Sequence, residues 1–358
     1  AIASFVLRRT ITLHERMVMS AGLNLSDGGG IVRLTRRVLF GTFIIEGTGA
    51  VLLSCRFVPH YGFPKGITMG VFHAVSAFCN AGFDLMGTPD DPFQSLIGWA
   101  EDPLVNITVM ALIVLGGLGF FVWSDVWDKH SFCRLRLHTK IVLTATAGLL
   151  LFGFGWTLLF EWSNPATLGA FDTPHKLLAA AFESVTLRTA GFNTIDLGAL
   201  TGPSQAVSCL LMFIGGSPGS TAGGIKTVTA AVLVLTAISA FCGRTTVSAF
   251  GRTIAPRSIM NAVTLLMAGG VLCLVGACAI AGIEDAPFHQ CLFEAVSAFG
   301  TVGVSMGLTP TLAAASRVIL IVMMYMGRVG VLTLGVAVFM RRREPPRLKY
   351  PDADVFIG

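Results

Sequence analysis

The stretch FEAVSAFGTVGVSMG, residues 293–307, has two related copies earlier in the chain. FHAVSAFCNAGFDLMG, residues 72–87, aligns with it without a gap, and FESVTLRTAGFNTIDLG, residues 182–198, aligns after a shift of one residue. The alignment superposes Gly82, Gly191 and Gly303, which follow one another at nearly equal intervals. Near-equal spacing with matching letters on both sides predicts a repeated structural unit.

Composition places these units in a membrane. Hydrophobic residues make up 53% of the 358 residues and charged residues only 13%, with a mean hydropathy of +0.74. This balance excludes an ordinary soluble domain. Apolar runs near membrane-spanning length predict six spans: 38–55, 105–122, 141–160, 206–240 (broken in the middle), 263–283 and 318–340. Most Lys and Arg residues lie in the connections on one side, which we predict to be cytoplasmic.

Each copy of the repeat begins with an apolar stretch that is too short to cross a bilayer. Such a stretch predicts a re-entrant helix that enters the membrane from outside. Non-helical backbone at membrane depth must line a watery cavity or be buried in protein, and a glycine there lets carbonyls turn inward. Thr301-Val302-Gly303 is also the Thr-Val-Gly of potassium-channel filters. The alternative is that the three glycines only allow tight helix packing.

The filter hypothesis assigns one backbone strand to each copy. Its residues are Asn80, Ala81, Gly82, Thr189, Ala190, Gly191, Thr301, Val302 and Gly303. The side chains of Asn80, Thr189 and Thr301 either add oxygens near an ion path or cap local turns. Because a fixed positive charge beside a cation path would repel the ion, we expect Arg188 to point away and to pair with a pore-helix carboxylate. Glu183 and Glu294 are the candidate supporting carboxylates.

The stretch GGSPGSTAGGIKT, residues 215–227, interrupts what should be a continuous span. It misses the phosphate-binding pattern G-x-x-x-x-G-K-[ST] by one residue and has no strand before it. Small and helix-breaking residues cannot hold a helix there. Arg328 is expected within the last span, where an arginine marks a functional site by default. Lys226 is ambiguous, because it could simply satisfy carbonyls of the loop.

The three repeat motifs, the broken span MFIGGSPGSTAGGIKT and the closing YPDADVFIG resemble the Trk/Ktr/HKT superfamily of potassium transporters over nearly the whole chain. Within it, the short C-terminus is most similar to the Ktr-type membrane subunit. The resemblance implies that residues 215–227 obstruct the pore beneath the filter, with Arg328 beside them at the constriction. The gate residues would be Gly215, Gly216, Ser217, Gly219, Ser220, Gly223, Gly224, Lys226 and Arg328.

The expected fold is an all-α polytopic membrane protein with repeated span–pore-loop–span units around a pseudo-fourfold central pore, three of four units being visible. Residues 1–37 would be a remnant of the first unit and a cytoplasmic link, so we expect an N-terminally incomplete chain. The second repeat would cover 38–136 (pore loop 70–87) and the third 137–256 (pore loop 178–196, gating loop 215–227). The fourth would cover 257–358 (pore loop 289–306), with a short cytoplasmic C-terminus.

The predicted function is potassium uptake across the plasma (inner) membrane, with sodium dependence left open. The alternatives are an alternating-access secondary transporter and a non-conducting fragment. The copies all run in the same direction, which favours a pore over inverted repeats. No nucleophile–base pair or metal cluster suggests an enzyme, and we predict no cofactor and no nucleic-acid partner. The resemblance also implies a homodimer and a cytoplasmic nucleotide-binding regulatory ring.

Overall fold

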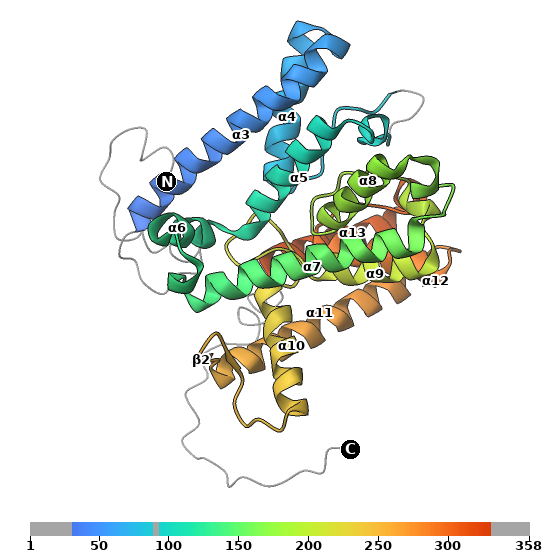
Figure 1. Cartoon of the computed structure of the whole chain (residues 1–358). Helices are drawn as coiled ribbons and strands as arrows, with labels where there is room; N and C mark the ends of the chain where they lie inside the picture. The colour runs from blue at the N-terminus through green and yellow to red at the C-terminus, as the bar shows by residue number, and fades with distance from the viewer. Residues whose placement is uncertain (1–30, 89–92, 331–358) are drawn as a thin grey trace.

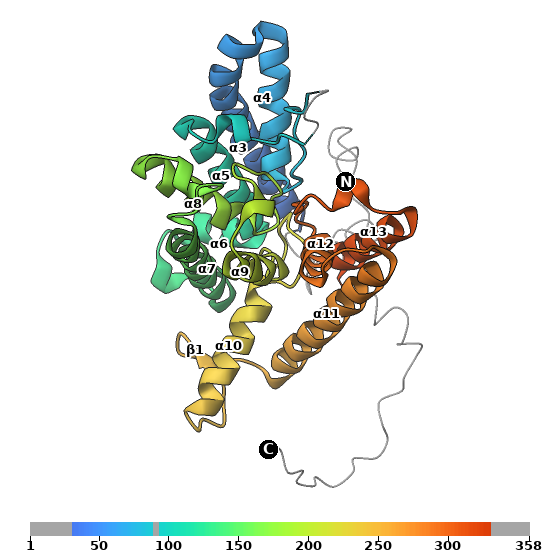
Figure 2. The same cartoon turned by 90° about the vertical axis from the view of Figure 1, so that its right-hand side faces the viewer.

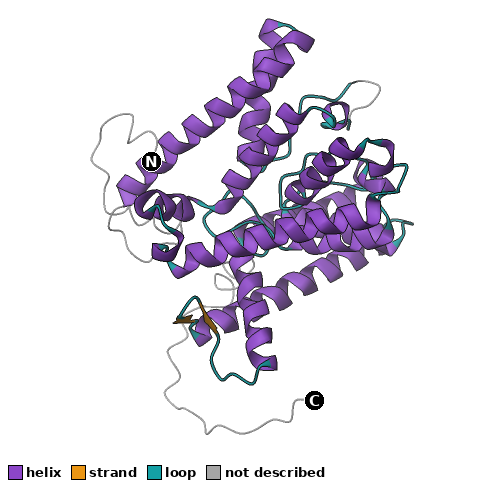
Figure 3. Cartoon of the chain, viewed as in Figure 1, coloured by secondary structure: helices purple, strands orange, loops and turns teal. Residues whose placement is uncertain are grey.

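The computed structural model describes residues 31–88 and 93–330. The regular secondary structure of the described residues is helical apart from one two-stranded hairpin, β1 (Ser248–Ala249) paired antiparallel with β2 (Arg252–Thr253) (Figure 3). Residues 1–30 of the predicted remnant at 1–37, residues 331–340 of the last predicted span and the closing YPDADVFIG lie outside the described residues, and residues 31–37 begin the first described helix. The helices are α3 (Ile31–Tyr61), α4 (Phe63–Phe78), α5 (Pro103–Leu118), α6 (Phe120–Lys129), α7 (Leu137–Glu161), α8 (Thr173–Thr186), α9 (Gly202–Phe213), α10 (Thr227–Phe241), α11 (Pro256–Ile283), α12 (Phe288–Gly300) and α13 (Ala314–Val329).

These helices form three groups with the same order of parts. A long helix is followed by a shorter one, a non-helical strand and a further helix: α3–α4–α5, α7–α8–α9 and α11–α12–α13. Within each group the short helix packs against its long neighbour, and α5 with α8 and α9 with α12 join one group to the next. Figures 1 and 2 show α3, α4 and α5 together at one end and α11, α12 and α13 at the other, with α7, α8 and α9 between them.

Helix ends follow local chemistry. Asp102 caps α5 by accepting hydrogen bonds from the amides of Leu104 and Val105, at 3.0 and 3.1 Å, with Pro103 in the first turn. At the other end, Gly119 has φ 91° and stops the helix. The predicted continuous span at 105–122 is therefore wrong in its last turn, because α6 leaves Gly119 at 91° to α5. Residues with side chains avoid that backbone conformation, so the turn depends on the glycine.

Three of the described helices, α3, α7 and α11, are long and apolar enough to cross a membrane, and the bent pair α5–α6 makes a fourth candidate. Large apolar side chains stay exposed along these helices and α13, among them Phe43, Leu151, Met267 and Ile321. In a membrane such surfaces face lipid. The short helices α4, α8 and α12 instead bury most of their C-terminal halves, with Phe78, Phe182, Phe293 and Phe299 fully buried. The core thus surrounds the ends of the short helices, where the repeated motifs lie.

Candidate functional site

Each short helix holds the strand that follows it by the same hydrogen bond. A hydroxyl on the helix donates to the carbonyl of the residue just after the repeat glycine. The pairs are Ser76 Oγ to Phe83 O at 2.7 Å, Thr186 Oγ1 to Phe192 O at 2.6 Å and Ser297 Oγ to Val304 O at 2.6 Å. The three strands therefore have the same register against their helices, although the copy at 182–198 needs a shift of one residue in the sequence alignment.

That shift is absorbed at the helix end. The amide of the residue before each glycine donates to the carbonyl of the same helix hydroxyl residue, at 2.9 Å in all three copies. The bonds span five residues from Ala81 to Ser76 and from Val302 to Ser297, and four from Ala190 to Thr186. A turn shortened by one residue keeps Gly191 in the position that Gly82 and Gly303 occupy in their copies.

The repeat glycines converge although they are far apart in sequence. A Cβ built on Gly82 would lie 2.8 Å from Gly191 Cα and 2.5 Å from the Ala190 carbonyl oxygen. A Cβ on Gly303 would have Gly191 Cα as its nearest neighbour, at 3.9 Å. All three have positive φ angles, between 72° and 93°. Gly191 lies between the other two, so the three strands meet around a common point.

The residues two positions before the glycines are also left-handed. Asn80, Thr189 and Thr301 have φ angles of 50°, 72° and 52°. This conformation is strained for a β-branched threonine, and such strain is concentrated at functional sites. Asn80 Nδ2 donates to Thr189 Oγ1 at 3.3 Å, which links two strands through their side chains. The sequence did not predict this strain, because a threonine gives no indication that its φ angle is positive.

The predicted loop at 215–227 joins α9 to α10, and backbone hydrogen bonds join its two ends. The Gly215 amide donates to Ile225 O at 2.8 Å, the Ile225 amide to Phe213 O at 3.1 Å and the Thr227 amide to Gly216 O at 3.0 Å. We call residues 213–216 together with 225–227 the neck, and residues 217–224 the crown. The chain enters and leaves the loop through one narrow closure.

The crown is held by other segments. The Ser217 amide donates to Gly117 O at 3.0 Å, and the Phe120 amide donates to Gly219 O at 3.1 Å, across the bend between α5 and α6. Within the crown, the Ser220 amide donates to Ser217 O at 3.2 Å. The break at Gly119 therefore creates the surface on which the crown rests.

The loop lies directly against all three strands. Thr221 Oγ1 is 3.4 Å from Asn80 Oδ1. A Cβ on Gly215 would lie 3.1 Å from Thr189 Cγ2, and one on Gly223 would overlap the Thr301 side chain. Gly224 approaches the end of α12, since its Cβ would lie 3.3 Å from Gly300 Cα. The same position of each copy thus contacts the loop, and the glycines make the approach possible.

Two basic side chains donate to crown carbonyls. Arg328 Nη1 donates to Thr221 O, and Lys226 Nζ donates to Ala222 O at 2.6 Å. Arg328 lies in the last turn of α13 and is exposed. The contact between Arg328 and the loop that the sequence suggested is present, and its gating role stays a prediction. Lys226 satisfies a carbonyl, as its simpler interpretation proposed.

Arg188 does not pair with Glu183, so that expectation is corrected. Its Nη2 donates to Gly215 O at 3.2 Å and to Thr227 Oγ1 at 2.8 Å. The Glu183 side chain has no hydrogen-bond partner among the described residues and is 1% exposed. Arg188 follows the helix end, where its side chain reaches the loop and does not contact Glu183.

The three copies carry different groups at the position of Glu183. Glu294 accepts from Ser305 Oγ at 2.5 Å, from the Met306 amide at 3.1 Å and from Thr309 Oγ1 at 2.6 Å. In the first described copy His73 Nε2 lies 3.3 Å from the Leu85 amide, which donates to it. Glu294 and His73 both hold the segment beyond their strand, as a supporting residue should. Glu183 makes no corresponding bond.

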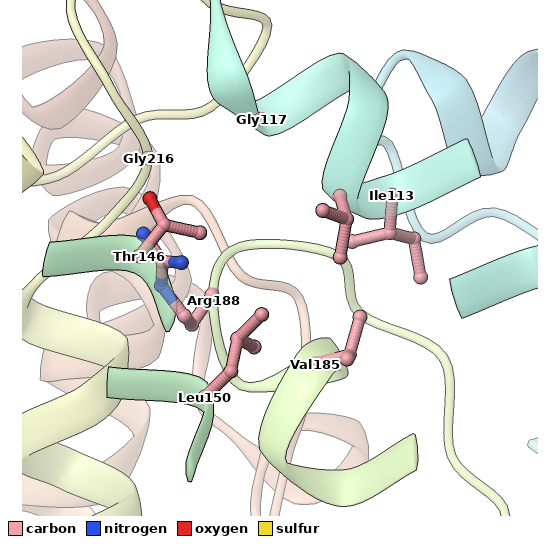
Figure 4. A pocket seen from close by; sticks show the side chains of 8 residues that line it. Ile113, Gly117, Thr146, Leu150, Val185, Arg188 and Gly216 are labelled. Carbon is pink, nitrogen blue, oxygen red and sulfur yellow. The ribbon is translucent and has the colours of Figure 1, made fainter. Parts of the chain in front are cut away.

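A small cavity adjoins the Arg188 side chain (Figure 4). Arg188 Nε and Thr146 Oγ1 are buried there, and neither has a hydrogen-bond partner within the described residues. The cavity is lined by Ile113, Val114, Gly117, Thr146, Leu150, Val185, Arg188 and Gly216. Arg188 is thus surrounded by α5, α7, α8 and the loop.

A model of the TrkH family, described as a cation transport protein, matches residues 8–344. The chain belongs to this family. It is 38% identical to the potassium/sodium uptake protein NtpJ of Enterococcus hirae, with 99% of this chain and 78% of that protein aligned. It is 39% identical to the Ktr system potassium uptake protein B of Bacillus subtilis, with the same two coverages.

The fold is also similar to a solved TrkH-family structure. The potassium transporter TrkH from Vibrio parahaemolyticus superposes with a TM-score of 0.71 at 16% sequence identity. The match covers 91% of this chain and 68% of that one. The predicted superfamily and the helical membrane-protein class are confirmed.

Proposed function

We propose that this chain takes up potassium across the plasma membrane through a channel-like path, with three of its filter strands at 80–82, 189–191 and 301–303. The observation that carries the proposal is the convergence of Gly82, Gly191 and Gly303 above a loop that contacts all three strands. Backbone carbonyls in such an arrangement replace the water shell of the ion. The named uptake functions of the relatives support the choice of potassium, with sodium as a second ion.

The loop at 215–227 is proposed as the barrier on this path, and Arg328 is proposed to hold the loop in place. A non-helical segment at membrane depth must be wrapped in protein, and the crown is bonded to α5, α6 and α13. The repeat arrangement around a pseudo-fourfold pore belongs to the same proposal. So do a homodimer and a cytoplasmic nucleotide-binding regulatory subunit; the Ktr-system names of the relatives favour a protein that works with further subunits.

Potassium uptake by a deficient bacterial strain tests the function. The strain expressing the chain should grow at low potassium and accumulate the ion. Gly303→Ser should raise sodium uptake relative to potassium. A Cβ on Gly303 would have no atom of the described residues closer than 3.9 Å, so the effect would come from the φ angle of 93°, which a residue with a side chain adopts only by distorting the strand. Gly148→Ser, on α7 with no atom within 4 Å of its Cβ, is the matched control. Unchanged ion preference in Gly303→Ser would refute the filter assignment.

A further inference from the structure

Arg188 connects two parts of the site that are otherwise separate. Its backbone directly precedes the strand Thr189-Ala190-Gly191, and its guanidinium lies on the neck of the loop. One nitrogen, Nη2, reaches both arms of the neck: Gly215 O on the entering arm and Thr227 Oγ1 on the leaving arm. Thr227 Oγ1 in turn donates to Gly215 O at 2.9 Å. The three groups form one closed hydrogen-bonded set.

The set is shielded from solvent. Arg188 is 8% exposed and Thr227 is fully buried. No carboxylate forms an ion pair with Arg188 in residues 31–88 and 93–330. A buried guanidinium that loses its hydrogen-bonding oxygens is left uncompensated, which is costly. Movement that separates the two arms of the neck would therefore pull on Arg188, and through it on the strand.

The other two copies lack this connection. Cys79 and Gly300 occupy the position of Arg188 in the alignment. The Cys79 thiol lies 4.0 Å from Glu46 Oε1 on α3, and Gly300 has no side chain. In these copies Asn80, Thr301 and Gly300 lie against the crown and not the neck.

We propose that Arg188 is a positioning residue that couples the filter strand Thr189-Ala190-Gly191 to the neck of the loop, so that the neck sets ion preference as well as barrier height. This inference rests on the proposed function. Among the described residues, the crown has no buried charged side chain that ties it to a filter strand, so its release changes the filter less than opening of the neck, which pulls on the strand at 189–191 through Arg188. Arg188 acts through its hydrogen bonds and does not contact the ion.

The test compares a neck variant with a crown variant in the full chain. Thr227→Val removes one bond of Arg188 while keeping the side-chain shape, and Thr227→Ser keeps the hydroxyl as the matched control. Arg328→Ala releases the crown. Uptake of potassium and of sodium is measured for each, at equal protein levels in the membrane. We expect Thr227→Val to raise the sodium-to-potassium uptake ratio about tenfold, which corresponds to about 1.4 kcal/mol.

Arg328→Ala should raise total uptake and leave that ratio unchanged, and Thr227→Ser should match the wild type. Arg188→Gln in the Thr227→Val background should add little, since the two residues act as one unit. A ratio unchanged by Thr227→Val, or changed equally by Arg328→Ala, would overturn the coupling. Wild-type protein that carries no potassium would instead refute the proposed function, and the role of Arg188 with it.

Discussion

The neck and the crown of the loop at 215–227 are each held by an arginine, but in opposite ways. Arg188 is buried and binds both arms of the neck, which are also bonded to each other through their backbones. Arg328 is exposed and binds one carbonyl of the crown, whose other bonds include those to α5, α6, Phe78, Asn80 and Lys226. The neck is therefore a rigid base, and the crown is the part that external contacts can release.

The largest effect should follow from filling the neck. A Cβ on Gly215 would overlap Gly223 O and press on Thr189, and overpacking of this kind costs about 1–3 kcal/mol or more. Gly215→Ala should abolish uptake and lower the thermal stability of the purified protein. Gly148→Ala, with open space around its Cβ, should leave both unchanged or slightly improved. Normal uptake by Gly215→Ala would show that the neck is not rigid.

Release of the crown should have a smaller effect and the opposite sign. Arg328→Ala removes the hydrogen bond to Thr221 O and a positive charge beside the proposed cation path. Potassium uptake should rise several-fold, measured as the initial rate at equal membrane levels. Shortening the crown should do likewise, and the combination should add little. Reduced uptake in both single variants would mean that the crown is not a barrier.

A neutral contact of the crown offers a finer test. Thr221 Oγ1 lies 3.2 Å from Phe78 O and 3.4 Å from Asn80 Oδ1, and one neutral hydrogen bond contributes about 1 kcal/mol. Thr221→Val should raise uptake less than Arg328→Ala, and Thr221→Ser should behave as the wild type. If Thr221→Val raised uptake more than Arg328→Ala, the Thr221 contact and not the Arg328 contact would be the stronger restraint on the crown.

The smallest effect concerns the support of α6, whose Phe120 amide donates to the crown at Gly219 O. Asp125 on α6 accepts from the Arg136 amide at 2.8 Å and pairs with Lys129 at 2.8 Å. Burial alone would raise the pKa of Asp125, but these hydrogen bonds outweigh it and lower the pKa below its ordinary value.

A lowered pKa in the folded state stabilises the protein above the unfolded value, near pH 4, and this contribution is lost as the pH falls further. The unfolding temperature of the wild type should therefore fall between pH 6 and pH 3, and the unfolding temperature of Asp125→Asn should fall less. Identical pH profiles for the two proteins would remove Asp125 from the support of α6.

Much of the site could be predicted from the letters. The repeated glycines, the short helices and the break at 215–227 have local causes: backbone freedom, length and helix-breaking residues. The partner of Arg188 was predicted wrongly, because Glu183 is near in sequence whereas Gly215 and Thr227 are near only in space. The bend at Gly119 was also missed, since a glycine in an apolar run looks like part of a span.

The sequence by itself determined that this is a helical membrane protein with three copies of one unit, since hydropathy and repetition are properties of the chain alone. It also fixed which backbone positions could approach closely, because only glycine leaves that room. Tertiary structure decided which copy touches which. The contacts of the crown with the α5–α6 bend and of Arg188 with the neck join residues distant in sequence, and the strained backbone of Thr189 and Thr301 depends on the packing around it. Such contacts depend on how the helices pack, and no local pattern encodes them.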